Sequence, residues 1–224
     1  SNGIQVLRSL QDRMDDRVSV RSFGVTGNSA DATERLQQAL LELYFRDDSK
    51  ASPQSRVILH VEAGEYVISS TVYIPPYATI VGAGKDKTVF RKTGDFVMFE
   101  TAAVHSIYDS TGFTPGVDAA YSYDRQPRKI HMSGCTLETT DNTGTLLKLK
   151  SLDNSYFSDI KLKGPRTFSQ TVYDISNTYP TELPATNAGL YINSHSDMVT
   201  SSHNTFINCE FIGGNLIEVH LRRN

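Results

Sequence analysis

The sequence predicts a mostly β protein, a solenoid of short strands with one short helix near its N-terminus. Residues 57–81 contain short alternating apolar segments separated by Gly and Pro turns, as strands require. Farther along, similar strand patterns return, and the copies that begin at Cys135 and Ile160 lie 25 residues apart. That spacing suits one solenoid rung of short strands and turns. Helical spacing instead marks a segment at about residues 31–46.

The helical segment has a start signal and an apolar face. Asp31 can cap the helix, and Glu34 follows three residues later, as in a capping box. The apolar positions that share one face are Ala32, Leu36, Ala39, Leu40 and Leu43. We therefore expect an amphipathic helix. Strands are expected within 57–62, 66–68, 71–74 and 80–81, each ended by a turn.

Two strand patterns recur in the second half of the chain. The first begins at Cys135, Ile160 and Cys209, and an apolar residue stands three positions before each: Met132, Phe157 and Phe206. The second occupies 97–100, 147–150, 190–193 and 217–220. Residues 101–128 and 165–186 are rich in Gly, Pro, Ser, Thr, Asp and Tyr, so we expect two long loop insertions there.

Stacked rungs place equivalent residues in rows about 4.8 Å apart. Leu162 is expected in an inward row that builds the core, and Lys161 is expected to face water. Cys135 and Cys209 share an inward row with Ile160 between them. Their Cα atoms are then near 10 Å apart, too far for a disulfide.

Composition narrows the function classes. The 224 residues carry a formal net charge of −3, which gives no basic footprint for nucleic acid. No apolar run reaches the roughly 20 residues of a membrane helix, and no signal peptide is visible. With two cysteines, no CxxC and no histidines at metal spacing, we expect no metal and no cofactor.

Three blocks in this order, residues 21–40, 61–66 and 80–84, carry a resemblance to a known family. Together they resemble the entrance to a right-handed, single-stranded parallel β-helix of the pectate-lyase-like kind, found in bacteriophage tailspikes and polysaccharide-degrading enzymes. The resemblance implies a capping α-helix at the N-terminal end of a β-helix domain over residues 21–224, preceded by a neck or linker helix over 1–20. The turn Gly27-Asn28-Ser29 departs from the usual Gly-Asp-Gly.

The same resemblance implies a function. We expect the receptor-binding domain of a phage tailspike, which recognises bacterial surface polysaccharide (capsule or O-antigen) with or without depolymerising it. The expected assembly is a homotrimer on the virion tail that acts outside the cell. One alternative is a non-catalytic structural or adhesive tail component. Another is a cellular secreted polysaccharide lyase or glycosidase. The paired-aspartate and Gly-His-Gly motifs of polygalacturonases are missing, which disfavours that activity.

The two ends of the chain carry further expectations. Ile4, Gln11 and Val18 share one heptad position and Leu7 and Met14 the other, which suits either a trimeric helical neck or a helix lying on its own domain. Residues 215–221 look like a strand without a cap, so we expect the natural protein to continue with further rungs.

Two outward rows are candidate sites. In the first, Glu138 faces Lys163 and Lys161 faces Glu210, the pattern of charge pairing on a solvated sheet.

The second outward row brings Tyr191 and Asn193 beside Glu218 and His220. A carboxylate near an imidazole can perform acid–base chemistry on a glycan, so Glu218 and His220 are the catalytic candidates. Tyr191 and Asn193 are substrate-binding candidates, and the alternative is a solvated face. The loop tyrosines that suit sugar stacking are Tyr121, Tyr123, Tyr173 and Tyr179. Their alternative is packing within the loops or against a neighbouring subunit.

Overall fold

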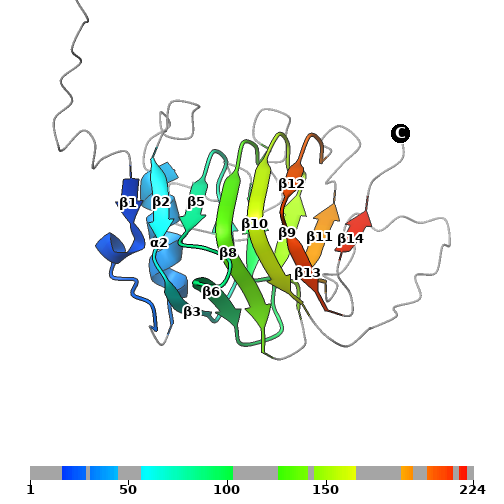
Figure 1. Cartoon of the computed structure of the whole chain (residues 1–224). Helices are drawn as coiled ribbons and strands as arrows, with labels where there is room; N and C mark the ends of the chain where they lie inside the picture. The colour runs from blue at the N-terminus through cyan, green and yellow to red at the C-terminus, as the bar shows by residue number, and fades with distance from the viewer. Residues whose placement is uncertain are drawn as a thin grey trace, which may run out of the picture.

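The computed structural model describes residues 17–28, 31–44, 57–102, 126–140, 144–164, 188–193, 201–213 and 217–220. These residues form a mostly β fold with one α-helix, α2 (Thr33–Tyr44), and one short 3-10 helix, η1 (Val20–Phe23). Figure 1 shows strands β1, β2, β5, β8, β10 and β12 side by side in one sheet, with α2 beside β2.

The strands form two sheets, and every pairing between described strands is parallel, as expected for a parallel β-helix. The larger sheet contains β1 (Arg17–Ser19), β2 (Ile58–Val61), β3 (Gly64–Ile68), β5 (Thr79–Gly82), β6 (Thr88–Lys92), β8 (His131–Thr139), β10 (Tyr156–Lys163), β12 (Thr205–Ile207) and β13 (Glu210–Ile212). The smaller sheet contains β4 (Val72–Ile74), β7 (Phe99–Thr101), β9 (Leu147–Lys150), β11 (Leu190–Asn193) and β14 (Ile217–His220).

The predicted repeat is confirmed in the larger sheet. Met132, Phe157 and Phe206 pair in one row across β8, β10 and β12. The rings of Phe157 and Phe206 stack with centroids 4.9 Å apart. Leu162 pairs with Leu137 and is only 2% exposed, so the predicted inward row is correct.

The register in the smaller sheet differs from the prediction at one strand. The sequence pattern aligned Val97 with Leu147, but Phe99 is the residue that pairs with Leu147. A shift of two residues keeps the same side chains facing inward, because strand side chains alternate with a period of two. The prediction also missed β1 and β6, and Val18 lies in β1 instead of a neck helix.

Helix α2 packs on the sheets at the N-terminal end and is tied to them by polar contacts. Asp31 caps it by accepting the backbone N–H of Thr33 at 2.9 Å. Burial raises the pKa of Asp31, but hydrogen bonds from Ser69 and Thr33 outweigh this, so the pKa lies below its usual value. The apolar face of the helix is buried, including Leu36 and Leu40.

Gln37 of α2 closes the edge of β4. Its amide nitrogen donates to the Tyr73 carbonyl at 3.2 Å, and its amide oxygen accepts the Tyr73 N–H at 2.7 Å. The Val72 N–H and the Ile74 carbonyl instead bond to the chain around β7. The backbone N–H and carbonyl of Tyr73 point away from β7, and Gln37 gives them the two hydrogen bonds that a neighbouring strand would otherwise supply.

Non-glycine residues with left-handed backbone mark the corner before four strands of the larger sheet. Tyr77, Lys129, Asn154 and His203 have φ of 64°, 52°, 48° and 53°. Each stands two residues before the first residue of its strand, β5, β8, β10 or β12. Because this conformation is uncommon outside glycine, its recurrence shows that the chain turns these four corners in the same way.

Close backbone contacts explain two glycines in the motif blocks. A side chain on Gly82 would place its Cβ 2.2 Å from the carbonyl oxygen of Gly134. A side chain on Gly27 would place its Cβ 2.8 Å from the Cα of Gly64. Both positions therefore require glycine for the backbones to approach this closely.

Candidate functional site

Arg91 organises one charged network on the outward face of the larger sheet. Its guanidinium contacts Glu65 and donates to Glu138, with Nε 2.7 Å from Oε1. Lys163 completes the network at 3.2 Å from the other oxygen of Glu138. Burial raises the pKa of Glu138, but hydrogen bonds from Arg91 and Lys163 outweigh it and hold the pKa below its usual value. The predicted Glu138–Lys163 pair is confirmed.

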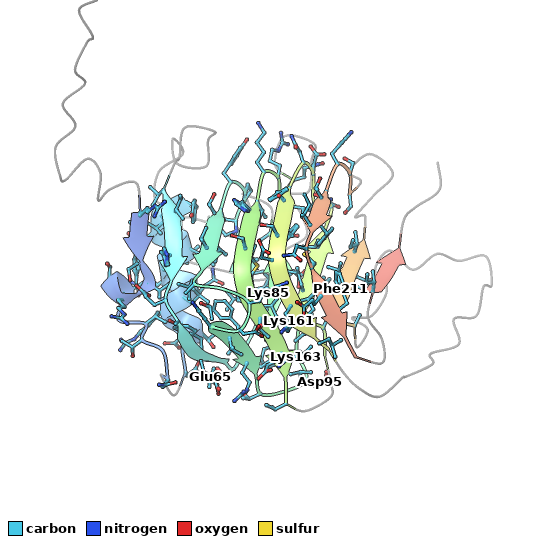
Figure 2. All side chains as sticks on the ribbon, viewed as in Figure 1. Glu65, Lys85, Asp95, Lys161, Lys163 and Phe211 are labelled. Carbon is cyan, nitrogen blue, oxygen red and sulfur yellow. The ribbon has the colours of Figure 1, made fainter. Side chains whose placement is uncertain are left out.

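A second network reaches across the sheet from the turn between β5 and β6. Lys85 in this turn lies 2.8 Å from Glu210 and donates to the Asn208 carbonyl at 3.2 Å. Asp86 lies 2.5 Å from Lys161, which is also 3.5 Å from Glu210. The predicted Lys161–Glu210 pair is confirmed. Figure 2 shows Lys85, Lys161 and Lys163 gathered on one part of the face.

Two features of this network were not predicted. Lys161 points outward, but its side chain is only 14% exposed because two carboxylates hold it, so the expectation that it simply faces water is wrong. Lys85 and Asp86 were missed because they lie in a turn, where no strand pattern indicates which rung they reach. The sequence separation of Lys85 from Glu210, and of Asp86 from Lys161, gives no sign that these pairs are in contact.

The same sheet has a second, uncharged part, separated from the two charged networks by a column of residues with left-handed backbone conformation. This column is Gly134, Asp159 and Asn208, with φ of 67°, 52° and 52°. On the far side of it, two outward rows carry no Asp, Glu, Lys or Arg between β2 and β12, whereas on the adjoining β1 the exposed Arg17 pairs with Ile58 of β2. One row is Thr79, His131, Tyr156 and Thr205, and the other is His60, Val81, Ser133, Ser158 and Ile207. These two rows are called the uncharged face below.

The outward row of the smaller sheet is the predicted site. Tyr73, Glu100, Lys148, Tyr191 and Glu218 succeed one another across β4, β7, β9, β11 and β14. Glu100 and Lys148 form an ion pair at 3.2 Å, with side chains only 16% and 10% exposed. Burial, and then the negative charge of Glu100, raise the pKa of Tyr73 to about 12. From Tyr73 to Tyr191 the side chains of this row are partly or fully buried.

The structure places some of the predicted site residues together. Tyr191 pairs with Glu218, and Asn193 pairs with His220, as the repeat predicted. Tyr191 is 1% exposed, so its ring offers no free stacking face. The side chains of Asn193, Glu218 and His220 lie outside the described part. Outside the described residues altogether lie Tyr121, Tyr123, Tyr173 and Tyr179.

A Ser, a His and an Asp also meet at the corner before β12. The Ser202 hydroxyl donates to Asp153 Oδ1 at 2.7 Å, and His203 Nδ1 lies 3.4 Å from the same oxygen. Both contacts converge on the carboxylate, whereas a nucleophilic triad needs the histidine between serine and aspartate. The cluster therefore fixes the corner and does not activate Ser202.

Lowered pKa values occur among the described carboxyl groups. Four of them have a pKa that departs clearly from the ordinary value, and each is lowered: Asp31, Asp86, Glu138 and Glu210. A general acid on a glycan needs a raised carboxyl pKa. These four groups are ionised at neutral pH and serve hydrogen bonds and ion pairs.

Two further properties concern the described residues alone. Among them, no group of three His, Cys, Asp or Glu side chains is arranged to hold a metal ion. No helix in the same ranges is long and apolar enough to cross a membrane. Cys135 and Cys209 are both free thiols, as predicted.

The fold is similar to that of two solved phage proteins. ORF18 of Geobacillus virus E2 superposes with a TM-score of 0.57 at 15% identity, covering 89% of this chain and 38% of that protein. The pre-mature gene product 12 of bacteriophage phi29 gives 0.56 at 16% identity, covering 89% and 23%. The chain thus spans well under half of either protein.

Sequence comparison gives the family. No curated protein is significantly similar to the chain in sequence. A family model described as "Rhamnogalacturonase A/epimerase, pectate lyase-like" matches residues 17–219, which is most of the chain. The described strands, paired in parallel rung upon rung, fit that description. The chain belongs to the rhamnogalacturonase A/epimerase family of pectate-lyase-like proteins.

Proposed function

We propose that this chain is the polysaccharide-binding domain of a phage tailspike, a virion component that holds bacterial surface polysaccharide outside the host cell. Family membership carries the proposal, because the family is named for a rhamnogalacturonase, an enzyme that acts on a polysaccharide. The two solved proteins of similar fold are both phage products, which favours a phage context over a cellular secreted enzyme.

The proposed architecture is a right-handed β-solenoid capped by α2, with two long loop insertions. The two bonds from Gln37 to β4 support the capping role. Since β1 already pairs with β2, the neck of the proposed homotrimer comprises residues before Arg17. Capsule or O-antigen is the proposed polysaccharide, held by Asn193 and the loop tyrosines Tyr121, Tyr123, Tyr173 and Tyr179. Burial of Tyr191 favours a supporting role for it, behind the groups that touch sugar.

Binding without cleavage is the first candidate. Depolymerisation is the second candidate, because the family description names an enzyme. In that case Glu218 and His220 are the proposed acid–base residues. Along β14 these two residues pair with Tyr191 and Asn193 of β11.

The experiment that separates these functions uses capsule and O-antigen preparations from a panel of bacteria. Binding is measured by titration, and cleavage by released reducing ends or by absorbance of unsaturated sugar. Binding without product formation supports an adhesin. Product formation that disappears in Glu218→Gln and His220→Ala, but persists in Lys163→Ala, supports a depolymerase. If no preparation binds, the proposed function is wrong.

A further inference from the structure

We propose that the uncharged face of the larger sheet binds a neutral, hydroxyl-rich saccharide segment laid across the strands. The inference rests on the proposed polysaccharide-binding function and adds to it a second surface, apart from the residues proposed on the smaller sheet and the loops, with its own ligand chemistry. The surface is formed by outward residues of β2, β5, β8, β10 and β12 (Figure 1). With about 4.8 Å between strands, the longer row extends roughly 19 Å, enough for several sugar rings.

The first argument is the separation of charge on one sheet. Solvated protein surfaces normally intersperse charged residues of both signs. Here the charges collect on one side of the left-handed column, around Arg91, Glu138 and Lys161. Solubility would favour charged residues on the uncharged face as well, so it does not explain why these rows have none. The pKa of His131 is lowered by burial, so this ring is also neutral at neutral pH. A ligand that covers this face does not have to remove water from a charged side chain of these two rows.

The second argument is a set of available hydroxyls. Ser133 and Ser158 pair with each other in one row, and Thr79 and Thr205 stand in the other row beside His131 and Tyr156. Within the described residues, no hydrogen bond to another residue occupies these four hydroxyls. A hydroxyl both donates and accepts, so it matches either role of a sugar hydroxyl. A protein partner that covered this face would need polar groups of its own to form hydrogen bonds with these four hydroxyls.

The third argument is an aromatic platform in the middle of the face. Tyr156 is 39% exposed although it lies on a central strand. Its ring meets His131 edge to face, with centroids 5.3 Å apart and an interplanar angle of 71°. That contact orients the ring. A fixed, partly exposed tyrosine between hydroxyl groups combines an apolar surface for a sugar ring with polar partners at its rim.

The same chemistry disfavours an acidic glycan. The uncharged face itself carries no lysine or arginine; the cations at its edges are Arg17 of β1 and Lys129, two residues before His131. The nearest cations of the charged half already contact carboxylates: Arg91 with Glu138, Lys161 with Asp86 and Lys163 with Glu138. A uronate would have to compete with these carboxylates for its counter-charge. Neutral saccharide is therefore the occupant that the surface favours.

The test maps binding on the whole chain by amide NMR. The neutral probes are dextran, mannan and galactan oligosaccharides, and the acidic probe is oligogalacturonate. We expect a neutral probe to shift the amide signals of Ser133, Ser158 and Thr205. Tyr156→Ala should weaken that binding about tenfold, since aromatic anchors commonly contribute this much. Lys163→Ala is the matched control, because it removes an outward side chain from the same strand and should leave affinity unchanged.

A second variant guards against a folding effect of Tyr156→Ala. Ser133→Ala combined with Ser158→Ala removes two hydroxyls without removing packing, and should weaken binding severalfold with an unchanged circular dichroism spectrum. If a neutral probe binds but shifts amides elsewhere, the face is not the site, although the proposed function stands. Preference for oligogalacturonate likewise overturns the inference. If no probe binds and Tyr156→Ala only lowers self-association in sedimentation, the face joins copies of this chain and the inference fails.

Discussion

Replacing Gln37 tests whether α2 serves as the edge partner of β4. In Gln37→Ala the Tyr73 N–H and carbonyl lose bonds of 2.7 Å and 3.2 Å at a buried position, since Gln37 is 8% exposed. A typical hydrogen bond contributes about 1 kcal/mol net, and a buried group left without its partner costs about 1–3 kcal/mol. We therefore expect the free energy of unfolding to fall by about 2–4 kcal/mol. For a chain of this size that corresponds to roughly 5–15 °C in Tm.

The neighbouring residue supplies the control. Gln38 has the same side chain on the same helix but is exposed, so Gln38→Ala should change stability by less than about 0.5 kcal/mol. Gln37→Glu should fall between the two, because a carboxylate can accept the Tyr73 N–H but cannot donate to the Tyr73 carbonyl. Urea unfolding followed by far-ultraviolet circular dichroism measures all three variants. Equal stability of Gln37→Ala and Gln38→Ala would refute the edge-capping role of α2.

Three further outcomes are expected. The pKa of Glu138 is lowered in the folded state, so its ion pairs stabilise the fold above the unfolded pKa and this stability is lost as pH falls. The difference in unfolding free energy between the wild type and Glu138→Gln should therefore be largest at pH 7 and shrink below about pH 4. A difference that stays constant with pH would contradict this. Leu162→Ala should lose about 2–5 kcal/mol whereas Lys163→Ala loses at most about 1 kcal/mol; a reversed order in urea unfolding would overturn the inward assignment. Thiol titration of denatured, unreduced protein should find two free thiols, Cys135 and Cys209. In the folded protein Cys135 should react far more slowly than in the denatured protein, because burial raises its pKa to about 12. Fewer than two thiols in the denatured protein would contradict the register.

The sequence alone determined the inward rows and most strands. Met132, Phe157 and Phe206 were predicted as equivalent positions and do pair across three strands. This worked because strand alternation is local, and an apolar residue at a fixed offset marks the same face in each rung. Asp31 as the helix cap was predicted for the same reason, since capping involves neighbours along the chain.

Prediction failed where a long loop stands between rungs. Phe99 and not Val97 pairs with Leu147, because the number of residues used by intervening turns sets the register and sequence periodicity cannot count them. The segment around Phe90 reads as T-V-F-R-K, and this alternation over β6 was the signal that could have revealed the missed strand.

The site shows the same division. Glu138 opposite Lys163 followed from the repeat, since both lie on strands of known phase. The tertiary structure alone decided that Lys85 and Asp86 reach across the sheet and that Tyr191, although outward, is buried. It also decided that charged and uncharged outward residues lie on opposite sides of Gly134, Asp159 and Asn208. Alternation tells which side of a strand a residue occupies. What covers that side depends on segments distant in sequence, and only the folded path of the chain brings them together.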